Sequence, residues 1–144
     1  MTSIRAATAA ELADWDERTV DAPGGHVYQS RAWAEHRVAA GWAADHLVFE
    51  DGSAVLALRR LFPLVVGCSA YVPRGPIPRD EEPAVTADRL TTLVEHLRMA
   101  SAAVVATDAE IPASTGYREL LASVGFRPIE EIQPSRHRVS LPLA

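Results

Sequence analysis

A proline-rich segment in the middle of the chain limits how it can fold more than any other feature of the sequence. Residues 73–80 are Pro-Arg-Gly-Pro-Ile-Pro-Arg-Asp, with three prolines within six positions. Each proline fixes φ near about −65° and lacks the amide hydrogen that a helix interior or a central strand needs. A stiff, extended loop must therefore separate the elements before this segment from those after it.

Local signals predict helices and strands on both sides of this loop. Thr8 and Glu11 have the spacing of a capping box, and Asp51-Gly52 is a strong hairpin signal. The clearest helix follows the loop, because apolar residues recur at helical spacing from Leu90 to Leu97. The expected strands cover 3–6, 46–50, 53–61, 69–72, 102–107 and 136–141. The expected helices cover 8–19, 31–40 with Ser30 as N-cap, 83–101 and a segment capped by Ser114 or Thr115. A strand or an extended segment follows from Phe126.

This order of elements predicts the fold class. Strands and helices are interspersed, with hairpin-connected strands in the middle, so we expect an α/β or α+β domain. Its sheet should be mixed, mostly antiparallel and flanked by helices. A length of 144 residues suits one domain, and 48% hydrophobic and 23% charged residues are ordinary for a soluble globular protein.

Charge and cysteine content exclude several classes of protein. The net charge is −5, so this chain alone is a poor candidate for binding nucleic acid. Cys68 is the only cysteine and the five histidines are scattered, so we expect neither a disulfide nor a metal site. The acidic N-terminus does not resemble a signal peptide, and the apolar run 61–72 is too short to cross a bilayer. We therefore expect a cytoplasmic protein that needs no cofactor.

The segment from Tyr71 to Pro76 is the most specific local feature. Arg74 is held between prolines beside Gly75, and a glycine lets a ligand approach the backbone. An arginine held in this way loses little entropy when it binds an anion. A rigid crossover loop with a solvated arginine explains the same residues equally well, so both interpretations stay open.

A second feature surrounds the helix expected over 31–40. Gln29 precedes it, Trp33 and Arg37 lie on it, and Trp42 follows it. The start of such a helix offers free N–H groups to an anion. Each tryptophan taken alone is explained more simply as part of the core.

Acidic residues at two places are candidates for proton transfer. Asp108 and Glu110 follow the strand expected over 102–107, where carboxylates suit acid–base chemistry but also commonly stabilise turns. Of these two interpretations we favour the turn. The acidic run 80–82 is interpreted as solvated.

Taken together, the two features resemble the FemAB family of peptidoglycan bridge-forming aminoacyltransferases, whose first domain has a GNAT-like fold. The family pattern is roughly Q-S/T-x-x-W-A-x-x-K, then G-W, a D-G hairpin and Y-x-P-R-G-P. The matching positions are Gln29, Ser30, Trp33, Ala34, Arg37, Gly41, Trp42, Asp51, Gly52, Tyr71, Pro73, Arg74, Gly75 and Pro76. The stretch 116–126 also resembles the helix-then-Gly-Phe ending of GNAT domains, and 132–134 resembles the segment that closes the family's first domain.

The resemblance implies which residues would bind substrate. Arg37, and with it Arg74, would neutralise the phosphates of a cell-wall precursor. Trp33 and Tyr71 would shape the cleft for its sugar and peptide, and Gly75 would let it approach the loop. The family often has a lysine where this chain has Arg37, so the charge is kept and the geometry changes.

The resemblance leaves the catalytic residue unassigned, with Asp80 and Asp108 as candidates. The family usually places an aspartate three residues after P-R-G-P, where this chain has Arg79, and Asp80 is offset by one position. The family's Asp-Pro pair is Asp108-Ala109 here. No metal site is implied.

The implied reaction is transfer of an amino acid from aminoacyl-tRNA to the stem-peptide amine of a lipid-linked or UDP-linked muramyl peptide. Residues 1–144 would be one GNAT-like domain, the first half of a two-domain enzyme, at the inner face of the membrane. The tRNA would be held through the second domain, so we expect these 144 residues alone to be inactive. Two alternatives stay open: a GNAT-like N-acyltransferase with another acyl donor, and a non-catalytic binding half-domain. The acetyl-CoA pyrophosphate loop of ordinary GNAT enzymes is not found in the sequence.

Overall fold

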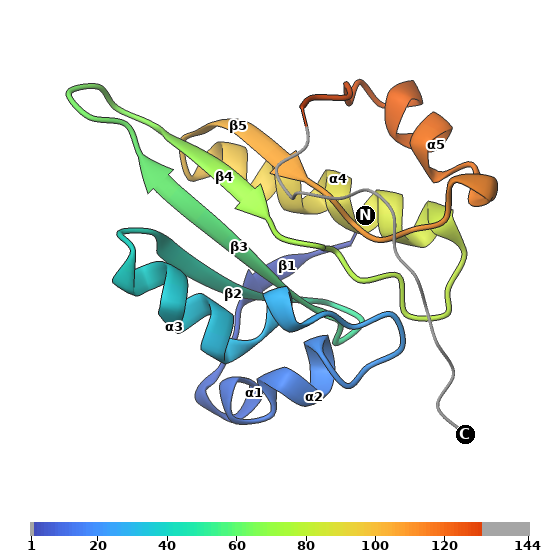
Figure 1. Cartoon of the computed structure of the whole chain (residues 1–144), viewed down its shortest axis with the longest axis horizontal. Coiled ribbons are helices and arrows are strands. Elements are labelled where there is room, and N and C mark those ends of the chain that lie inside the picture. The colour runs from blue at the N-terminus through green and yellow to red at the C-terminus, as the bar shows by residue number, and fades with distance from the viewer. Residues whose placement is uncertain (1, 131–144) are drawn as a thin grey trace.

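The computed structural model describes residues 2–130 and has a five-stranded sheet at its centre, in the order β1-β2-β3-β4-β5 (Figure 1). The strands are β1 (Ile4–Ala6), β2 (Ala43–Phe49), β3 (Ala54–Leu61), β4 (Cys68–Val72) and β5 (Ala102–Thr107). Neighbours from β1 to β4 pair antiparallel, and β4 pairs parallel with β5. The mixed, mostly antiparallel sheet is thus confirmed. The strand expected over 136–141 and the segment 132–134 lie outside the described residues.

Helices cover both faces of the sheet, with α1 to α3 on one side and α4 on the other (Figure 1). The helices are α1 (Ala9–Ala13), α2 (Trp15–Thr19), α3 (Arg31–Ala39), α4 (Pro83–Met99) and α5 (Tyr117–Ser123), with 3₁₀ turns η1 (Val27–Gln29) and η2 (Ala113–Thr115). The proline segment forms the crossover from β4 to α4, as its composition predicts.

Alternation along the strands divides the core into two clusters. On β3, Val55 and Ala57 face α4, whereas Leu56 and Leu58 face α1 to α3. Cys68 is buried on the α4 side, as expected for a structural thiol. Tyr71 lies on the side of α1 to α3. The strand period of two therefore decides which residues near the loop share a face.

Most local signals form as predicted, with corrections near two helix ends. The Thr8–Glu11 capping box is present, and the Ser30 hydroxyl caps α3 by accepting from the Trp33 N–H. The helix expected over 8–19 is divided at Asp14 into α1 and α2. The proposed caps of α5 were wrong, because Ser114 and Thr115 belong to η2 and Gly116 precedes the helix at φ +75° without a side-chain bond. Residues 126–130 form no strand.

A buried arginine connects the β2–β3 turn to α4. Arg89 is 3% exposed and forms ion pairs with Asp51 and Glu81. The run 80–82 is therefore not simply solvated, as the sequence suggested. Hydrogen bonds from Ser53 also reach the Asp51 carboxylate, so this group fixes the turn and the end of the proline loop together.

Candidate functional site

The Pro-Arg-Gly-Pro loop is held in place by the side chain of Gln29. The amide Nε2 donates to the carbonyl of Pro73 at 2.6 Å and to that of Leu56 at 3.2 Å, and Oε1 accepts from the Leu56 N–H at 2.7 Å. Gln29 is completely buried. One side chain thus joins η1, β3 and the loop, which explains why a polar residue occupies the core.

Gly75 allows this arrangement because the loop lies directly against Gln29. A Cβ atom at position 75 would come within 2.7 Å of Nε2 and 3.0 Å of Cδ of Gln29. Sequence analysis assigned Gly75 to the approach of a ligand. The structure shows that the close approach at this glycine is made by the protein's own glutamine.

Asp108 holds the other side of the loop. Its carboxylate accepts from the Tyr71 hydroxyl at 2.8 Å and from the Arg74 N–H at 2.6 Å. Thr107 adds a hydrogen bond to the carbonyl of Gly75. Because β4 and β5 are parallel, their carboxyl ends lie at the same edge of the sheet, which brings these residues together.

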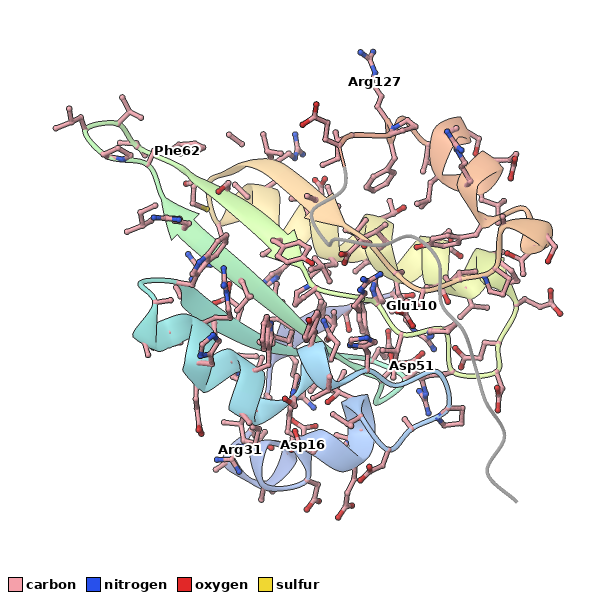
Figure 2. All side chains as sticks on the ribbon, viewed as in Figure 1. Asp16, Arg31, Asp51, Phe62, Glu110 and Arg127 are labelled. Carbon is pink, nitrogen blue, oxygen red and sulfur yellow. The ribbon has the colours of Figure 1, made fainter. Side chains whose placement is uncertain are left out.

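The side chain of Arg74 points toward two carboxylates. Arg74 Nη1 lies 3.6 Å from Oε1 of Glu110, and Nε lies 3.9 Å from Oδ2 of Asp108. The same Oε1 of Glu110 lies 3.7 Å from Nε2 of His26. Figure 2 shows Glu110 beside the loop that links α2 to η1. The guanidinium is therefore partly neutralised by the fold itself.

Ring contacts continue from His26 to the helix that carries Arg37. The His26 and Tyr28 rings are 4.9 Å apart, and Tyr28 stacks on Trp33 at 4.2 Å. The Arg37 guanidinium lies 5.8 Å from the Trp33 centroid and 5.0 Å from that of Trp42. We call the set Arg74, Glu110, His26, Tyr28, Trp33 and Arg37 the contact chain; it joins the two sequence features on one side of the sheet.

The two predicted binding arginines differ in their surroundings. Among residues 2–130, no carboxylate forms an ion pair with Arg37, whereas Arg74 has two such neighbours.

The two catalytic candidates also differ in position. Asp80 is exposed, in the turn before α4. Asp108, the other catalytic candidate, holds the turn, as favoured from the sequence, and touches Tyr71 and Arg74 at once.

His26 and Tyr28 are not among the site residues expected from the sequence, and the contacts of Gln29 and Glu110 were not predicted either. His26 was counted only among the scattered histidines. Its ring meets Glu110 across 84 positions of sequence, so no local pattern could have indicated the pair. For Tyr28, the aromatic spacing to Trp33 was the one available signal.

A mostly apolar cavity of about 460 Å³ lies between β5 and α5. Val105, Leu121 and Phe126 contribute to its lining. Asp108, which also bonds to the Pro-Arg-Gly-Pro loop, lines the cavity as well. Burial raises the pKa of Tyr117, at its wall, to about 12. Within residues 2–130, no three acidic, histidine or cysteine side chains gather so as to hold a metal ion, and no helix could span a membrane.

Solved structures of other proteins share this arrangement of strands and helices. FemX matches with a TM-score of 0.67 and 20% identity, over 87% of this chain and 32% of FemX. The aminoglycoside 6'-N-acetyltransferase AAC(6')-Ih from Acinetobacter baumannii matches with a TM-score of 0.51 and 14% identity, over 97% of this chain and 100% of that one. AAC(6')-IG from Acinetobacter haemolyticus matches with a TM-score of 0.50 and 18% identity, over 96% and 99%.

The chain has a GNAT-like fold. The fold class predicted from the sequence is thereby confirmed, and the fold is shared with part of FemX. The chain spans about a third of the length of FemX. No protein-family model and no curated protein matches the sequence.

Proposed function

We propose that this chain is the acceptor-binding part of an aminoacyltransferase that acts on a peptidoglycan precursor. The contact chain carries the proposal, because it joins on one face the two motifs by which the sequence resembles the FemAB family. The fold shared with FemX supports the same assignment. In this proposal the chain is one domain of a two-domain enzyme.

Arg37 is the residue we assign to the precursor's phosphates. Its guanidinium has two indole rings beside it and no ion-pair partner among residues 2–130, so an anion meets no competing carboxylate. A planar guanidinium can bind phosphate with two parallel hydrogen bonds. Trp33 and Tyr28 offer stacked rings for the apolar face of a sugar.

Arg74 has a different role in this proposal. An anion would have to compete with Glu110 and Asp108 for its charge, so we assign Arg74 to positioning these carboxylates. They then face the stem-peptide amine, which arrives as a cation and must lose a proton before it attacks the ester.

Glu110 is our candidate for accepting that proton. His26 is less suitable, because its Nδ1 accepts from the Tyr28 N–H and its Nε2, on the side of Glu110, carries the proton in the neutral ring. Glu110 would take the first proton from the ammonium group, and the neutral amine would then form the new C–N bond. As the ester C–O bond breaks, one of the two remaining amine protons would pass to the leaving 3'-oxygen of the tRNA, and Glu110 would later release its proton to water. This is aminolysis, which depends on positioning of both substrates.

The donor end is proposed to lie in the second domain. The tRNA backbone is polyanionic and binds chiefly to basic surfaces, which a chain of net charge −5 lacks overall. We therefore propose that this chain binds the acceptor and shows no transfer on its own. Incubation with charged tRNA and precursor should give no product above the rate in buffer.

A second candidate is an N-acyltransferase with an acyl-CoA donor. It is favoured by the two acetyltransferases of the same fold, because this chain spans 99% and 100% of their lengths. Such an enzyme would need no second domain. The loop before α4 argues against it.

That loop is poorly suited to a pyrophosphate. Three of its positions are prolines without an N–H, and the N–H groups of Arg74 and Glu81 already bond to Asp108 and to the carbonyl of Pro78. The acidic run 80–82 also lies at the start of α4, where it would repel an anion.

Binding measurements separate the two candidates. We expect the UDP-linked muramyl pentapeptide to raise the melting temperature of the chain and acetyl-CoA to leave it unchanged. Arg37→Ala should weaken precursor binding by about tenfold, as expected for loss of a charge-assisted contact of roughly 1.5 kcal/mol. In a full-length enzyme the same change should raise KM more than it lowers kcat.

Arg31→Ala is the matched control. Arg31 begins the same helix, but its backbone N–H donates to the carboxylate of Asp16 on α2, beside which it lies in Figure 2. Stabilisation by acetyl-CoA alone would favour the acyl-CoA enzyme. Precursor binding that Arg37→Ala leaves intact would remove Arg37 from the site.

A further inference from the structure

The tip of the β3–β4 hairpin is apolar and exposed, which the proposed function does not explain. Residues 62–67 connect Leu61 to Cys68, the last paired residues of the two strands. The exposed aliphatic side chains, 65% to 104% accessible, are Leu61, Leu64, Val65 and Val66. Figure 1 shows this hairpin projecting from the body of the molecule, and Figure 2 places Phe62 on it.

The hairpin projects because β3 is longer than its neighbour. β2 pairs with β3 only as far as Arg59, so Arg60 and Leu61 pair with β4 alone. Beyond Leu61 the tip extends by about three residues, or about 10 Å. Its side chains therefore lie clear of the sheet and of the helices that cover it.

The surroundings of the tip are basic and aromatic. Arg59 and Arg60 directly precede the tip, and Arg59 is ion-paired with Asp45. Arg60, directly before the tip, is exposed, and its guanidinium lies 5.8 Å from the ring of Trp42. Arg37 lies 5.0 Å from the same ring. Among residues 2–130, neither Arg60 nor Arg37 forms an ion pair, so two uncompensated guanidinium groups lie on the side of the hairpin marked by Trp42.

We propose that this hairpin docks the protein on an anionic lipid bilayer, with residues 61–66 below the headgroups and Arg60 and Trp42 among them. Aliphatic side chains gain by leaving water, and interfacial segments sit about 5–10 Å into the headgroup–acyl boundary, which matches the reach of the tip. Tryptophan favours that boundary and arginine is attracted to anionic lipids.

The backbone of the tip suits shallow insertion. The Phe62 N–H donates to the carbonyl of Gly67 at 3.0 Å, which closes the loop, and Pro63 has no N–H to desolvate. Fewer polar groups therefore lose water than in an ordinary loop of this length.

A protein partner fits these observations less well. A specific interface of standard size buries about 800 Å² on each partner and has a polar rim. The tip is a single six-residue loop with a narrow point and no polar side chain between Leu61 and Val66. A bilayer would surround the inserted tip on all sides, and its anionic headgroups would place negative charge beside Arg60.

This proposal stands without the proposed function. Where both hold, Arg37 lies close to the headgroups, because it shares Trp42 with Arg60. The phosphates it binds would then belong to the lipid-linked precursor. This assignment of the phosphates rests on the proposed function. The vesicle experiment uses no precursor, so the docking proposal and the proposed function can fail separately.

Cosedimentation of the chain with vesicles tests the docking. We expect binding to vesicles of mixed phosphatidylglycerol and phosphatidylcholine, and much weaker binding to pure phosphatidylcholine. Leu64→Ser/Val66→Ser should weaken binding at least about tenfold, because two aliphatic side chains no longer leave water. Arg60→Gln should weaken binding to the anionic vesicles by about fivefold.

Val124→Ser/Ile129→Ser is the matched control, because both residues are exposed aliphatics. They flank Arg127 in sequence, which Figure 2 shows well away from Phe62 on the hairpin, so this variant should bind like the parent chain. Absence of vesicle binding overturns the proposal. So does binding that salt abolishes and Leu64→Ser/Val66→Ser leaves intact, because it would be purely electrostatic. Self-association of the chain that the same double variant abolishes, without vesicle binding, would assign the tip to a second copy.

A fluorescent label reports whether the tip itself enters the lipid. The native Cys68 is buried, so an environment-sensitive dye can be placed selectively through Val65→Cys. We expect a blue shift of this dye on anionic vesicles and none for the same dye at Val124→Cys. Equal spectra at both positions would contradict insertion.

Discussion

The two ends of β4 are opposite in character. At its start, the hairpin tip exposes aliphatic side chains, and its backbone is closed by the Phe62–Gly67 hydrogen bond. At its end, the Pro-Arg-Gly-Pro loop is buried and is bonded to Gln29 and Asp108. The loop end is fixed by residues distant in sequence, so its shape is a property of the whole fold. The tip has few such contacts, so its exposed side chains are available to contact other molecules.

This comparison predicts that substitutions at the loop end destabilise the fold and those at the tip do not. The largest effect is expected for Gln29→Leu. It removes three buried hydrogen bonds, so the Leu56 N–H, the Leu56 carbonyl and the Pro73 carbonyl each lose the side chain that they bond to. This should lower the free energy of unfolding by about 3 kcal/mol. Urea unfolding followed by circular dichroism measures this. A loss below about 1 kcal/mol would show that the loop is not held by Gln29.

Gly75→Ala should have the next largest effect. The new methyl group would overlap Gln29 Nε2, so the glutamine or the loop must shift, at about 2 kcal/mol. Gly52→Ala separates this overlap from a general glycine effect. Position 52 has nothing within 4 Å of a Cβ and costs only the strain of its φ of +81°, about 1 kcal/mol. Equal losses for the two variants would refute the steric argument.

Low pH should destabilise the fold through Asp51, because its ion-pair partner Arg89 also holds Glu81 at the end of the proline loop. Burial favours the neutral carboxyl, but hydrogen bonds from Ser53 and Arg89 outweigh it and hold the pKa of Asp51 at about 2. The unfolded chain takes up this proton near pH 4, so the stabilisation is complete above that pH and is lost as the pH falls toward 2. From pH 5 to pH 3 a shift of this size would lower the free energy of unfolding by about 1 kcal/mol. Because Asp51 is partly exposed, we expect about 0.5 kcal/mol through this group.

Comparison with Arg89→Gln isolates this contribution from those of other carboxylates. The variant lacks the charge that lowers the pKa of Asp51 and also of Glu81. Its deficit relative to the parent chain in urea unfolding should therefore be smaller at pH 3 than at pH 5. A deficit independent of pH would indicate that Arg89 stabilises the fold by packing alone.

The smallest effect is expected at the tip. Leu64→Ser/Val66→Ser should change the free energy of unfolding by no more than about 0.5 kcal/mol, because both side chains are already exposed. Thermal unfolding of the isolated chain without lipid is the measurement. A large loss would mean that the tip packs within the fold, and the contrast between the ends of β4 would disappear.

Much of the fold could be predicted because its signals are local. Capping by Thr8 and Ser30, the Asp51-Gly52 hairpin and the apolar spacing of α4 each depend on residues a few positions apart. The predicted caps of α5 were wrong because that prediction also used local signals alone. Ser114 and Thr115 have good capping side chains but lie in η2, just before the helix.

The stiffness of the proline loop, the strand period that sorts side chains to two faces, and the resemblance to a family of transferases all follow from the order of residues along the chain. What those residues contact depends on how the sheet and the helices pack. This packing joins Gln29 to Pro73, and His26 to Glu110, and it gives carboxylate neighbours to Arg74 but none within residues 2–130 to Arg37. Such pairings depend on strand order and helix placement, which bring together residues dozens of positions apart and leave no periodic trace along the chain.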